Sequence, residues 1–172
     1  ICMSGLYGRE VPLKYIVKST PSSLHSFHEL CSILGDGKFV LTTVDTIFRE
    51  VEFAQFISAF EQSNVDGCFP VTDYIDDETP LYVGVDDTMY INGFYDENNG
   101  CRYVSAGIYG LDSKAKTIAQ HCIERGTSRM RNFQRALIAE GLNIKAHPFT
   151  KVLDIDHVGD IRNAEDFLRL NS

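Results

Sequence analysis

Residues 38–62 read KFVLTTVDTIFREVEFAQFISAFEQ, and the change of pattern within this stretch indicates the fold class. The first seven residues, 38–44, are mostly apolar or β-branched, which predicts a buried strand. Over residues 50–62 the apolar side chains recur at helical spacing and put four large ones on one face: Phe53, Phe56, Ile57 and Phe60. A buried strand that leads into an amphipathic helix is typical of α/β domains.

The sequence on either side continues this alternation. Upstream, residues 11–19 predict a strand, and Pro21-Ser22-Ser23 supplies a turn and an N-cap for a helix over residues 24–34. Downstream, the expected elements are strands over 68–74, 81–85, 89–94 and 102–109, helices over 114–124 and 130–140, a strand over 143–149 and a helix over 164–170. We therefore predict a single α/β domain with a Rossmann-like, mixed but mainly parallel sheet flanked by helices.

The composition limits the class of partner. The 172 residues carry a formal net charge of -8, which disfavours nucleic-acid binding because that binding depends on clustered Lys and Arg. Five cysteines without a C-x-x-C pair indicate neither a disulfide framework nor a zinc knuckle. No apolar run approaches the ~20 residues of a membrane span. We expect a cytoplasmic protein that binds neither membranes nor nucleic acid. If it handles phosphates, its acidic composition means that a divalent cation should help.

Asp45 follows the first predicted strand of this stretch. In open α/β sheets the ligand crevice lies outside the carboxyl ends of the strands, so Asp45 is expected at its rim. A carboxylate there suits Mg²⁺, which usually takes one or two protein carboxylates and completes its shell with water and substrate phosphates. The alternative is that Asp45 only caps the following turn.

A second acidic cluster, Asp154 and Asp156, follows a short apolar run near the C-terminal end. Two carboxylates from distant strand ends can hold one cation between them, and Asp154 and Asp156 share a face if the segment is extended. The alternative is a pair of solvent-facing acids next to a helix start.

Four segments in order resemble the landmarks of the sugar-nucleotide pyrophosphorylase and MobA-like nucleotidyltransferase family. They are Ser19-Thr-Pro-Ser-Ser-Leu-His-Ser26, Phe39-Val-Leu-Thr-Thr-Val-Asp45-Thr-Ile-Phe48, Val104-Ser-Ala-Gly-Ile-Tyr109 and Leu153-Asp-Ile-Asp156. Together they span nearly the whole chain, so the resemblance implies a nucleotide-diphospho-sugar transferase type of fold. It further implies a nucleotide-binding part over residues 1–63 and an acceptor-binding part with a closing helix over residues 64–172.

The resemblance also implies roles for individual residues. Asp45 and Asp154 correspond to the two metal-binding, catalytic aspartates, with Asp156 as a rival of Asp154 for the metal. The remaining matched positions are Ser19, Ser22 and Ser23 at the nucleobase turn, and Ser105 and Gly107 in the segment that lines the sugar pocket.

The sequence departs from the family in three places. Ser105 replaces the usual asparagine, and residues 95–99 lack the Glu-Lys-Pro that lies near the sugar phosphate. Arg129 and Arg131 are candidates for that phosphate because guanidinium groups match its oxygens, although they are equally compatible with solvent-facing positions. The Gly-rich phosphate loop that opens the family has no counterpart, so we expect an N-terminally truncated chain whose sheet is completed by upstream residues or by self-association.

The expected function follows from the resemblance. It is Mg²⁺-dependent transfer of a nucleoside monophosphate from a nucleoside triphosphate to a sugar phosphate or similar phosphorylated alcohol, with release of pyrophosphate, and without activity in this fragment alone. The alternative is a noncatalytic module or partner subunit that binds a sugar nucleotide.

Overall fold

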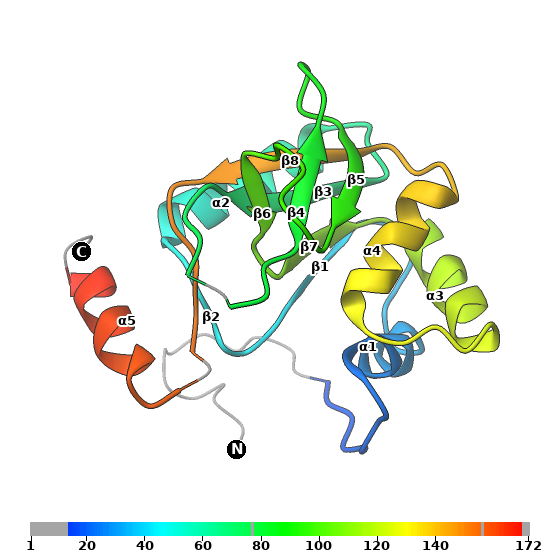
Figure 1. Ribbon diagram of the computed structural model, residues 1–172. Helices are drawn as coiled ribbons and strands as arrows, with labels where there is room; N and C mark the ends of the chain where they lie inside the picture. Colours follow the sequence, from blue (N-terminus) through cyan, green and yellow to red (C-terminus); the bar gives the residue numbers. More distant parts are fainter. Residues whose placement is uncertain (1–13, 77, 156, 170–172) are drawn as a thin grey trace.

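The computed structural model describes residues 14–76, 78–155 and 157–169, and Figure 1 shows their arrangement. The described helices are α1 (Ser23–Cys31), α2 (Glu50–Gln62), α3 (Lys114–Glu124), α4 (Met130–Ala139) and α5 (Asp160–Arg169). The strands are β1 (Phe39–Thr42), β2 (Thr46–Ile47), β3 (Gly67–Thr72), β4 (Tyr82–Val85), β5 (Ile91–Tyr95), β6 (Tyr103–Ser105), β7 (Ile108–Leu111), β8 (Ile144–Phe149) and β9 (Leu153–Asp154). None of these helices is long and apolar enough to span a membrane.

β3 lies at the centre of a seven-stranded sheet. It pairs with β8 in parallel, while β6 and β7 pair antiparallel with its two ends on the other side. β1 then pairs with β7, and β4 joins β6 to β5, all antiparallel. Among the described strands β3–β8 is therefore the single parallel pairing.

The prediction of a mixed sheet is confirmed, but the prediction of a mainly parallel one is wrong. β1 and β3 do run in the same direction, as their connection through α2 suggests, because each is antiparallel to β7. β7 comes from much later in the sequence and is inserted between them. The local strand–helix–strand pattern therefore predicted the relative direction of two strands that are not neighbours.

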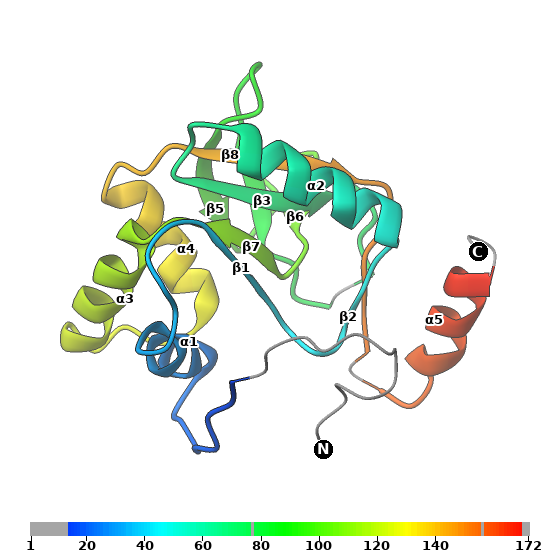
Figure 2. The ribbon, with the colours of Figure 1, turned by 180° about the vertical axis from the view of Figure 1, so that it is seen from behind.

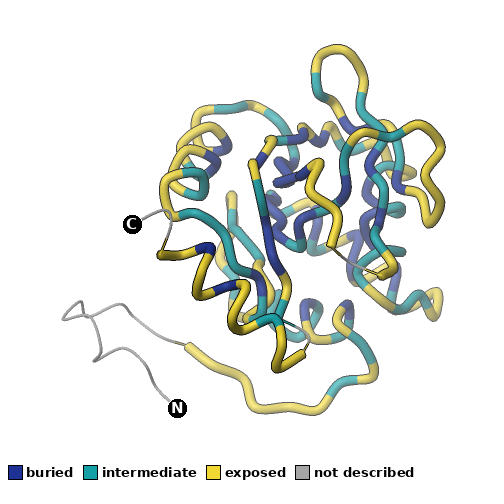
Figure 3. The backbone as a smooth tube through the Cα atoms, turned by 60° about the vertical axis from the view of Figure 1, so that its left-hand side comes forward, coloured by how far each residue is buried: buried dark blue, intermediate teal, exposed yellow. Residues whose placement is uncertain are grey.

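Helices cover both faces of the sheet (Figures 1 and 2). α1, α3 and α4 pack on one face over alternate strand residues such as Phe69 and Val71, and α2 packs on the other over Cys68 and Phe149. This split follows from the alternation of side chains along a strand. Figure 3 shows the buried residues gathered in the strands and on the inner sides of these helices.

α2 is anchored at both ends. Lys38 Nζ donates to the carbonyl oxygen of Phe60 in the last turn and to that of the C-cap residue Ser63, where a positive charge is favourable. Near its start, Glu52 Oε1 accepts a hydrogen bond from the backbone N–H of Thr150, 2.8 Å away, which ties α2 to the end of β8. The segment that leads from β8 to α5 is thereby fixed against the body of the domain.

Most predicted elements agree with the structure to within a few residues, and α2 and α3 have the predicted bounds. The strand predicted over residues 11–19 is wrong for its described part, because residues 14–19 form no strand and are exposed. The closing helix begins at Asp160, four residues earlier than predicted.

Candidate functional site

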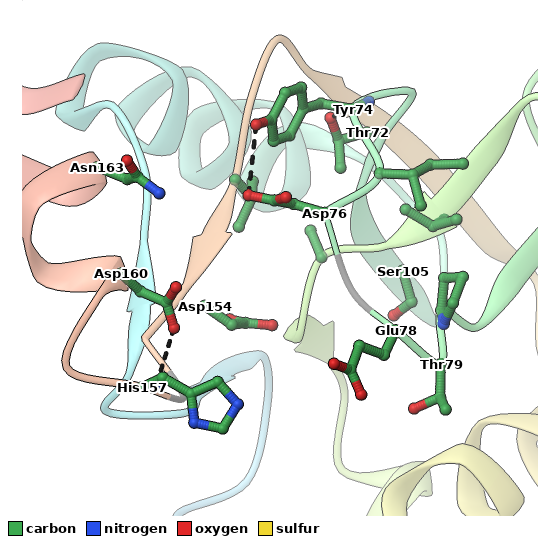
Figure 4. A pocket seen from close by; sticks show the side chains of 15 residues that line it. Thr72, Tyr74, Asp76, Glu78, Thr79, Ser105, Asp154, His157, Asp160 and Asn163 are labelled. Atoms are coloured by element: carbon green, nitrogen blue, oxygen red, sulfur yellow. Dashed lines mark hydrogen bonds between the residues drawn. The ribbon is translucent and has the colours of Figure 1, made fainter. Parts of the chain in front are cut away.

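A cavity of about 400 Å³ opens at the carboxyl ends of β3 and β8, the one parallel pair (Figure 4). Four segments form its wall. They are the end of β3 with the loop that follows, the β6–β7 connection, the β9 segment, and the start of α5, and their lining residues are Thr72, Tyr74, Ile75, Asp76, Glu78, Thr79, Pro80, Val104, Ser105, Ala106, Val152, Asp154, His157, Asp160 and Asn163. The location agrees with the rule that ligands of α/β sheets bind outside the carboxyl ends of parallel strands.

A short antiparallel ribbon of β2 and β9 brings Asp45 and Asp154 together. Thr46 pairs with Asp154, and the Thr46 hydroxyl donates to Asp154 Oδ1 at 3.0 Å. The backbone N–H of Ile155 donates to the carbonyl oxygen of Asp45 at 3.0 Å. Asp154 lines the cavity, whereas Asp45 is half-buried beside the ribbon and is not among the lining residues.

The β6–β7 connection lies against this ribbon. Gly107 has a φ of +70°, in the left-handed region that favours glycine, and a Cβ at this position would lie 3.4 Å from Thr46 Oγ1. Two residues earlier, Ser105 lines the cavity and donates its hydroxyl to Gln134 Oε1 at 3.1 Å. The structure thus brings Ser105, Gly107 and Asp154 to one site.

The cavity is acidic. Asp76, Glu78, Asp154 and Asp160 line it, and none of the lysines or arginines in the described ranges does. Asp160 Oδ2 also accepts a hydrogen bond from the backbone N–H of His157 at 2.7 Å, which caps the start of α5 (Figure 4). Burial raises the pKa of the Tyr109 phenol above its ordinary value, and the nearby Asp154 carboxylate raises it further. The Asp154 charge is therefore close to a buried hydroxyl that stays protonated.

The donor set fits Mg²⁺ better than a softer metal. In residues 14–76, 78–155 and 157–169, no three His, Cys, Asp or Glu side chains gather closely enough to hold a metal ion on their own. Carboxylate oxygens from one or two residues, completed by substrate phosphates, are the usual Mg²⁺ environment in proteins. Asp154 presents its carboxylate to the cavity, whereas Asp45 meets the β9 segment through its backbone carbonyl and does not line the cavity. The rival metal candidate Asp156 lies outside the described residues.

The three serines assigned to the nucleobase turn lie away from this cavity. Ser22 Oγ accepts the backbone N–H of Arg129 at 3.2 Å, and Ser23 Oγ accepts that of Met130 at 3.3 Å. These contacts join the start of α1 to the start of α4. Ser19 is exposed in the segment before α1.

The two candidate arginines also lie outside the cavity wall. Arg131 donates to Asp96 Oδ1 at 2.8 Å and to the carbonyl oxygen of Thr79 at 3.0 Å, so its guanidinium holds the loop that forms one side of the cavity. Hydrogen bonds from Arg135 and Arg131 hold the pKa of Asp96 below its ordinary value. Arg129 is the N-cap residue of α4 and has a φ of +69°.

Sequence reasoning did not single out several residues of the wall. Tyr74, Asp76, Glu78 and Asn163 become neighbours of Asp154 only when the loop after β3 and the start of α5 fold over the same strand ends. Residues 73–78 form an acidic run, but it lacks the ligand spacing and glycine of a Ca²⁺-binding EF-hand loop, so the sequence alone favours a solvated loop.

No protein-family model matches the sequence, and no curated protein matches it significantly. Solved structures do match. The inositol-1-phosphate CTP transferase from T. maritima superposes with a TM-score of 0.71 and 18% identity, over 84% of this chain and 60% of that one. A protein from Bacillus anthracis described as a putative glucose-1-phosphate thymidylyltransferase, solved in complex with sucrose, gives a TM-score of 0.79 and 15% identity, over 93% of this chain and 66% of that one.

A nucleoside-diphosphate-sugar pyrophosphorylase from Vibrio cholerae RC9 gives a TM-score of 0.61 and 17% identity, over 90% of this chain and 67% of that one. The chain has the fold of these nucleotidyltransferases. At identities of 15 to 18% the likeness establishes the fold of this chain, and the chain spans 60 to 67% of the three solved proteins. In this nucleotidyltransferase fold the acidic cavity lies at the carboxyl ends of β3 and β8.

Proposed function

We propose that the protein takes part in the Mg²⁺-dependent transfer of a nucleoside monophosphate from a nucleoside triphosphate to a sugar phosphate or similar phosphorylated alcohol. The observation that carries this proposal is the position of Asp154, which lines the cavity next to Asp45 on the β2–β9 ribbon of a nucleotidyltransferase fold. In this proposal residues 1–63 contribute to the nucleotide side of the site and residues 64–172 to the acceptor side.

The reaction needs positioning more than proton transfer. An oxygen of the acceptor phosphate attacks the α-phosphorus in line, a new P–O bond forms, and the bond to the leaving pyrophosphate breaks, with the electron pair leaving on pyrophosphate. Mg²⁺ supplies charge neutralisation when bound. Asp45 and Asp154 would hold it, and the Thr46 hydroxyl keeps Asp154 in place. No general base is needed because the attacking phosphate is already ionised.

The wall of the cavity suits the acceptor. Ser105 and Ala106 offer a hydroxyl and a small side chain on one side, and the loop through Thr79 forms the other. We assign Ser105 and Gly107 to the acceptor pocket. We assign Ser19, Ser22 and Ser23 to the nucleobase, which they would contact through their backbone. The hydroxyls of Ser22 and Ser23 already accept hydrogen bonds from the start of α4.

A thermal-shift screen tests the proposal. The thermal unfolding of the chain is measured with CTP, UTP, GTP, ATP and dTTP and with the corresponding nucleoside diphosphate glucoses, each with and without Mg²⁺. A ligand that binds the folded state raises its stability by RT ln(1 + [L]/Kd). We expect a Mg²⁺-dependent rise with one nucleobase that disappears in Asp154→Asn. The control Asp87→Asn changes an exposed aspartate in the β4–β5 turn and should keep the shift.

The outcomes separate the candidate functions. Binding together with pyrophosphate release in the presence of an acceptor supports the transferase. Binding without turnover is the result expected of this fragment under both candidates, so only pyrophosphate release separates the transferase from the noncatalytic module. An unaltered shift in Asp154→Asn would remove Asp154 from the site.

A further inference from the structure

A second cavity of about 460 Å³ continues from the first (Figure 4 shows the residues they share). Tyr74, Asp76 and Asn163 line both cavities. Arg49, Lys151, Asp166 and Phe167 complete the second one, between the start of α2 and the inner side of α5. The acidic first cavity therefore opens into a space with two cationic side chains.

The cationic side chains of Arg49 and Lys151 form no ion pair with a carboxylate of the described residues. None of the ion pairs among the described residues includes either of them. Both instead lie over aromatic rings. Lys151 Nζ is 4.1 Å from the centre of the Tyr74 ring, and the Arg49 guanidinium carbon is 5.6 Å from that of Phe167. A cation over an aromatic ring keeps its N–H groups available for a second partner.

Arg49 also has a buried donor with no partner. Its Nε is inaccessible to solvent and makes no hydrogen bond with the described residues. A buried guanidinium N–H without an acceptor is unfavourable, so native proteins rarely leave one. Because Nε is closed to water it is also closed to a ligand, so a phosphate would bind the other N–H groups of Arg49 and the Lys151 ammonium, since both residues line the cavity. Guanidinium and ammonium groups both form charge-assisted hydrogen bonds with phosphate oxygens.

We propose that Arg49 and Lys151 form a subsite for a phosphate monoester, the phosphorylated group of the acceptor. The inference rests on the proposed function and supplies the cations that residues 95–99 lack. With the phosphate between Arg49 and Lys151, the rest of the acceptor extends past Tyr74 and Asn163 into the first cavity, toward Ser105 and Asp154.

Three carboxylates limit the affinity of this subsite. Asp76 and Asp166 line the cavity. Glu52 lies in the first turn of α2, where one carboxylate oxygen accepts the Thr150 N–H and the other, Oε2, is buried without a hydrogen-bond partner among the described residues. We therefore expect inorganic phosphate to bind in the millimolar range, on the order expected for a few charged hydrogen bonds. A sugar 1-phosphate should bind more tightly because it also contacts the first cavity.

The test is a titration of the ¹⁵N-labelled chain with inorganic phosphate and with glucose 1-phosphate, followed by amide chemical shifts. We expect saturable shifts around Arg49, Thr150 and Lys151 with both ligands. Arg49→Gln and Lys151→Gln should each weaken binding about tenfold or more. Matched controls are Arg125→Gln, which removes an arginine paired with Glu140, and Lys145→Gln, which removes a lysine over Tyr90. Both should bind phosphate like the parent chain.

The outcomes separate this subsite from the proposed function. Shifts that lie elsewhere, an absence of saturable shifts, or an unchanged affinity in both variants would overturn the subsite. If phosphate binds at Arg49 and Lys151 but no nucleotide binds or reacts, the subsite stands and the transferase proposal fails. If the chain binds a nucleotide at Asp154 while Arg49→Gln and Lys151→Gln bind glucose 1-phosphate normally, the transferase proposal stands and the subsite fails.

Discussion

The hydroxyl of Thr46 donates to Asp154 Oδ1 at 3.0 Å across the β2–β9 ribbon, although 108 residues separate the two in the sequence. Thr46 is buried, and the turn at Gly107 covers it. Among the described residues, this contact orients the one carboxylate that is both on the ribbon and in the wall of the candidate site.

Replacing Thr46 should therefore loosen the carboxylate. Thr46→Val keeps the shape of the side chain and removes the donor, so we expect divalent-cation binding to weaken while stability falls by only about 1 kcal/mol. Mn²⁺ can stand in for Mg²⁺, and its paramagnetic broadening of amide signals near Asp154 is the measurement. Thr42→Val, at the exposed end of β1, is the control. Equal broadening in Thr46→Val and the parent chain would contradict this role.

Arg131 should affect ligand binding through the loop it holds. Its guanidinium donates hydrogen bonds to the Thr79 carbonyl oxygen and to Asp96. Because the Arg131–Asp96 ion pair is partly exposed, Arg131→Met should lower the free energy of unfolding by only about 0–1 kcal/mol. The loop that carries Thr79 should become more mobile, and the nucleotide found by the thermal screen should bind more weakly.

Amide hydrogen exchange of residues 78–82 is the measurement for this loop. Arg131→Lys should be intermediate because an ammonium cannot bond both acceptors as a guanidinium fork does. Arg125→Met, at an exposed ion pair with Glu140, should leave the loop unchanged. Unchanged exchange in Arg131→Met would show that the loop does not depend on this contact.

Gly110 is required by the packing of β7 against β3. A Cβ at this position would lie 2.8 Å from the carbonyl oxygen of Cys68 and 2.9 Å from a ring carbon of Phe60. Because one of these is backbone, we expect Gly110→Ala to lower the free energy of unfolding by about 1–3 kcal/mol. Urea denaturation measures the change. Gly35→Ala, with no atom within 4 Å of the added Cβ, should stay within about 0.5 kcal/mol of the parent.

Asp66 should make stability depend on pH at the acid end. The hydrogen bond from Lys114 lowers the pKa of Asp66 below its ordinary value, and the backbone N–H of Asn143 adds a second bond at 2.9 Å. A lowered folded-state pKa means that the stabilisation is present above the unfolded pKa of about 3.9 and is lost as pH falls through the folded pKa.

Asp66→Asn should accordingly be less stable than the parent at pH 7 by about 1 kcal/mol, with the difference shrinking below pH 4. Thermal unfolding at pH 7, 5, 4 and 3 measures this. Asp36→Asn, whose side chain is 99% exposed, should follow the parent curve. A difference that stays constant from pH 7 to pH 3 would contradict the assignment.

Parts of the candidate site were predictable because a resemblance connects distant residues. The segments around Asp45 and Asp154 are each short, and neither indicates the other by spacing. Their order in the family implied that they meet, and the β2–β9 ribbon puts them side by side. The cations of the proposed phosphate subsite were not predictable in this way. Arg131 forms an ion pair with Asp96, and Arg49 and Lys151 lie in segments without a recognisable motif.

The sequence by itself determined the helices and the class of fold. α2 and α3 could be placed to the residue because a helix is specified by contacts between residues three and four apart. Tertiary structure alone decided which strands are neighbours. The pairing of β7 between β1 and β3, and of β2 with β9, depends on burying side chains that lie tens of residues apart. The cavity is made by those same long-range pairings, so its acidic wall and its two adjacent cations could be recognised only after the chain had folded.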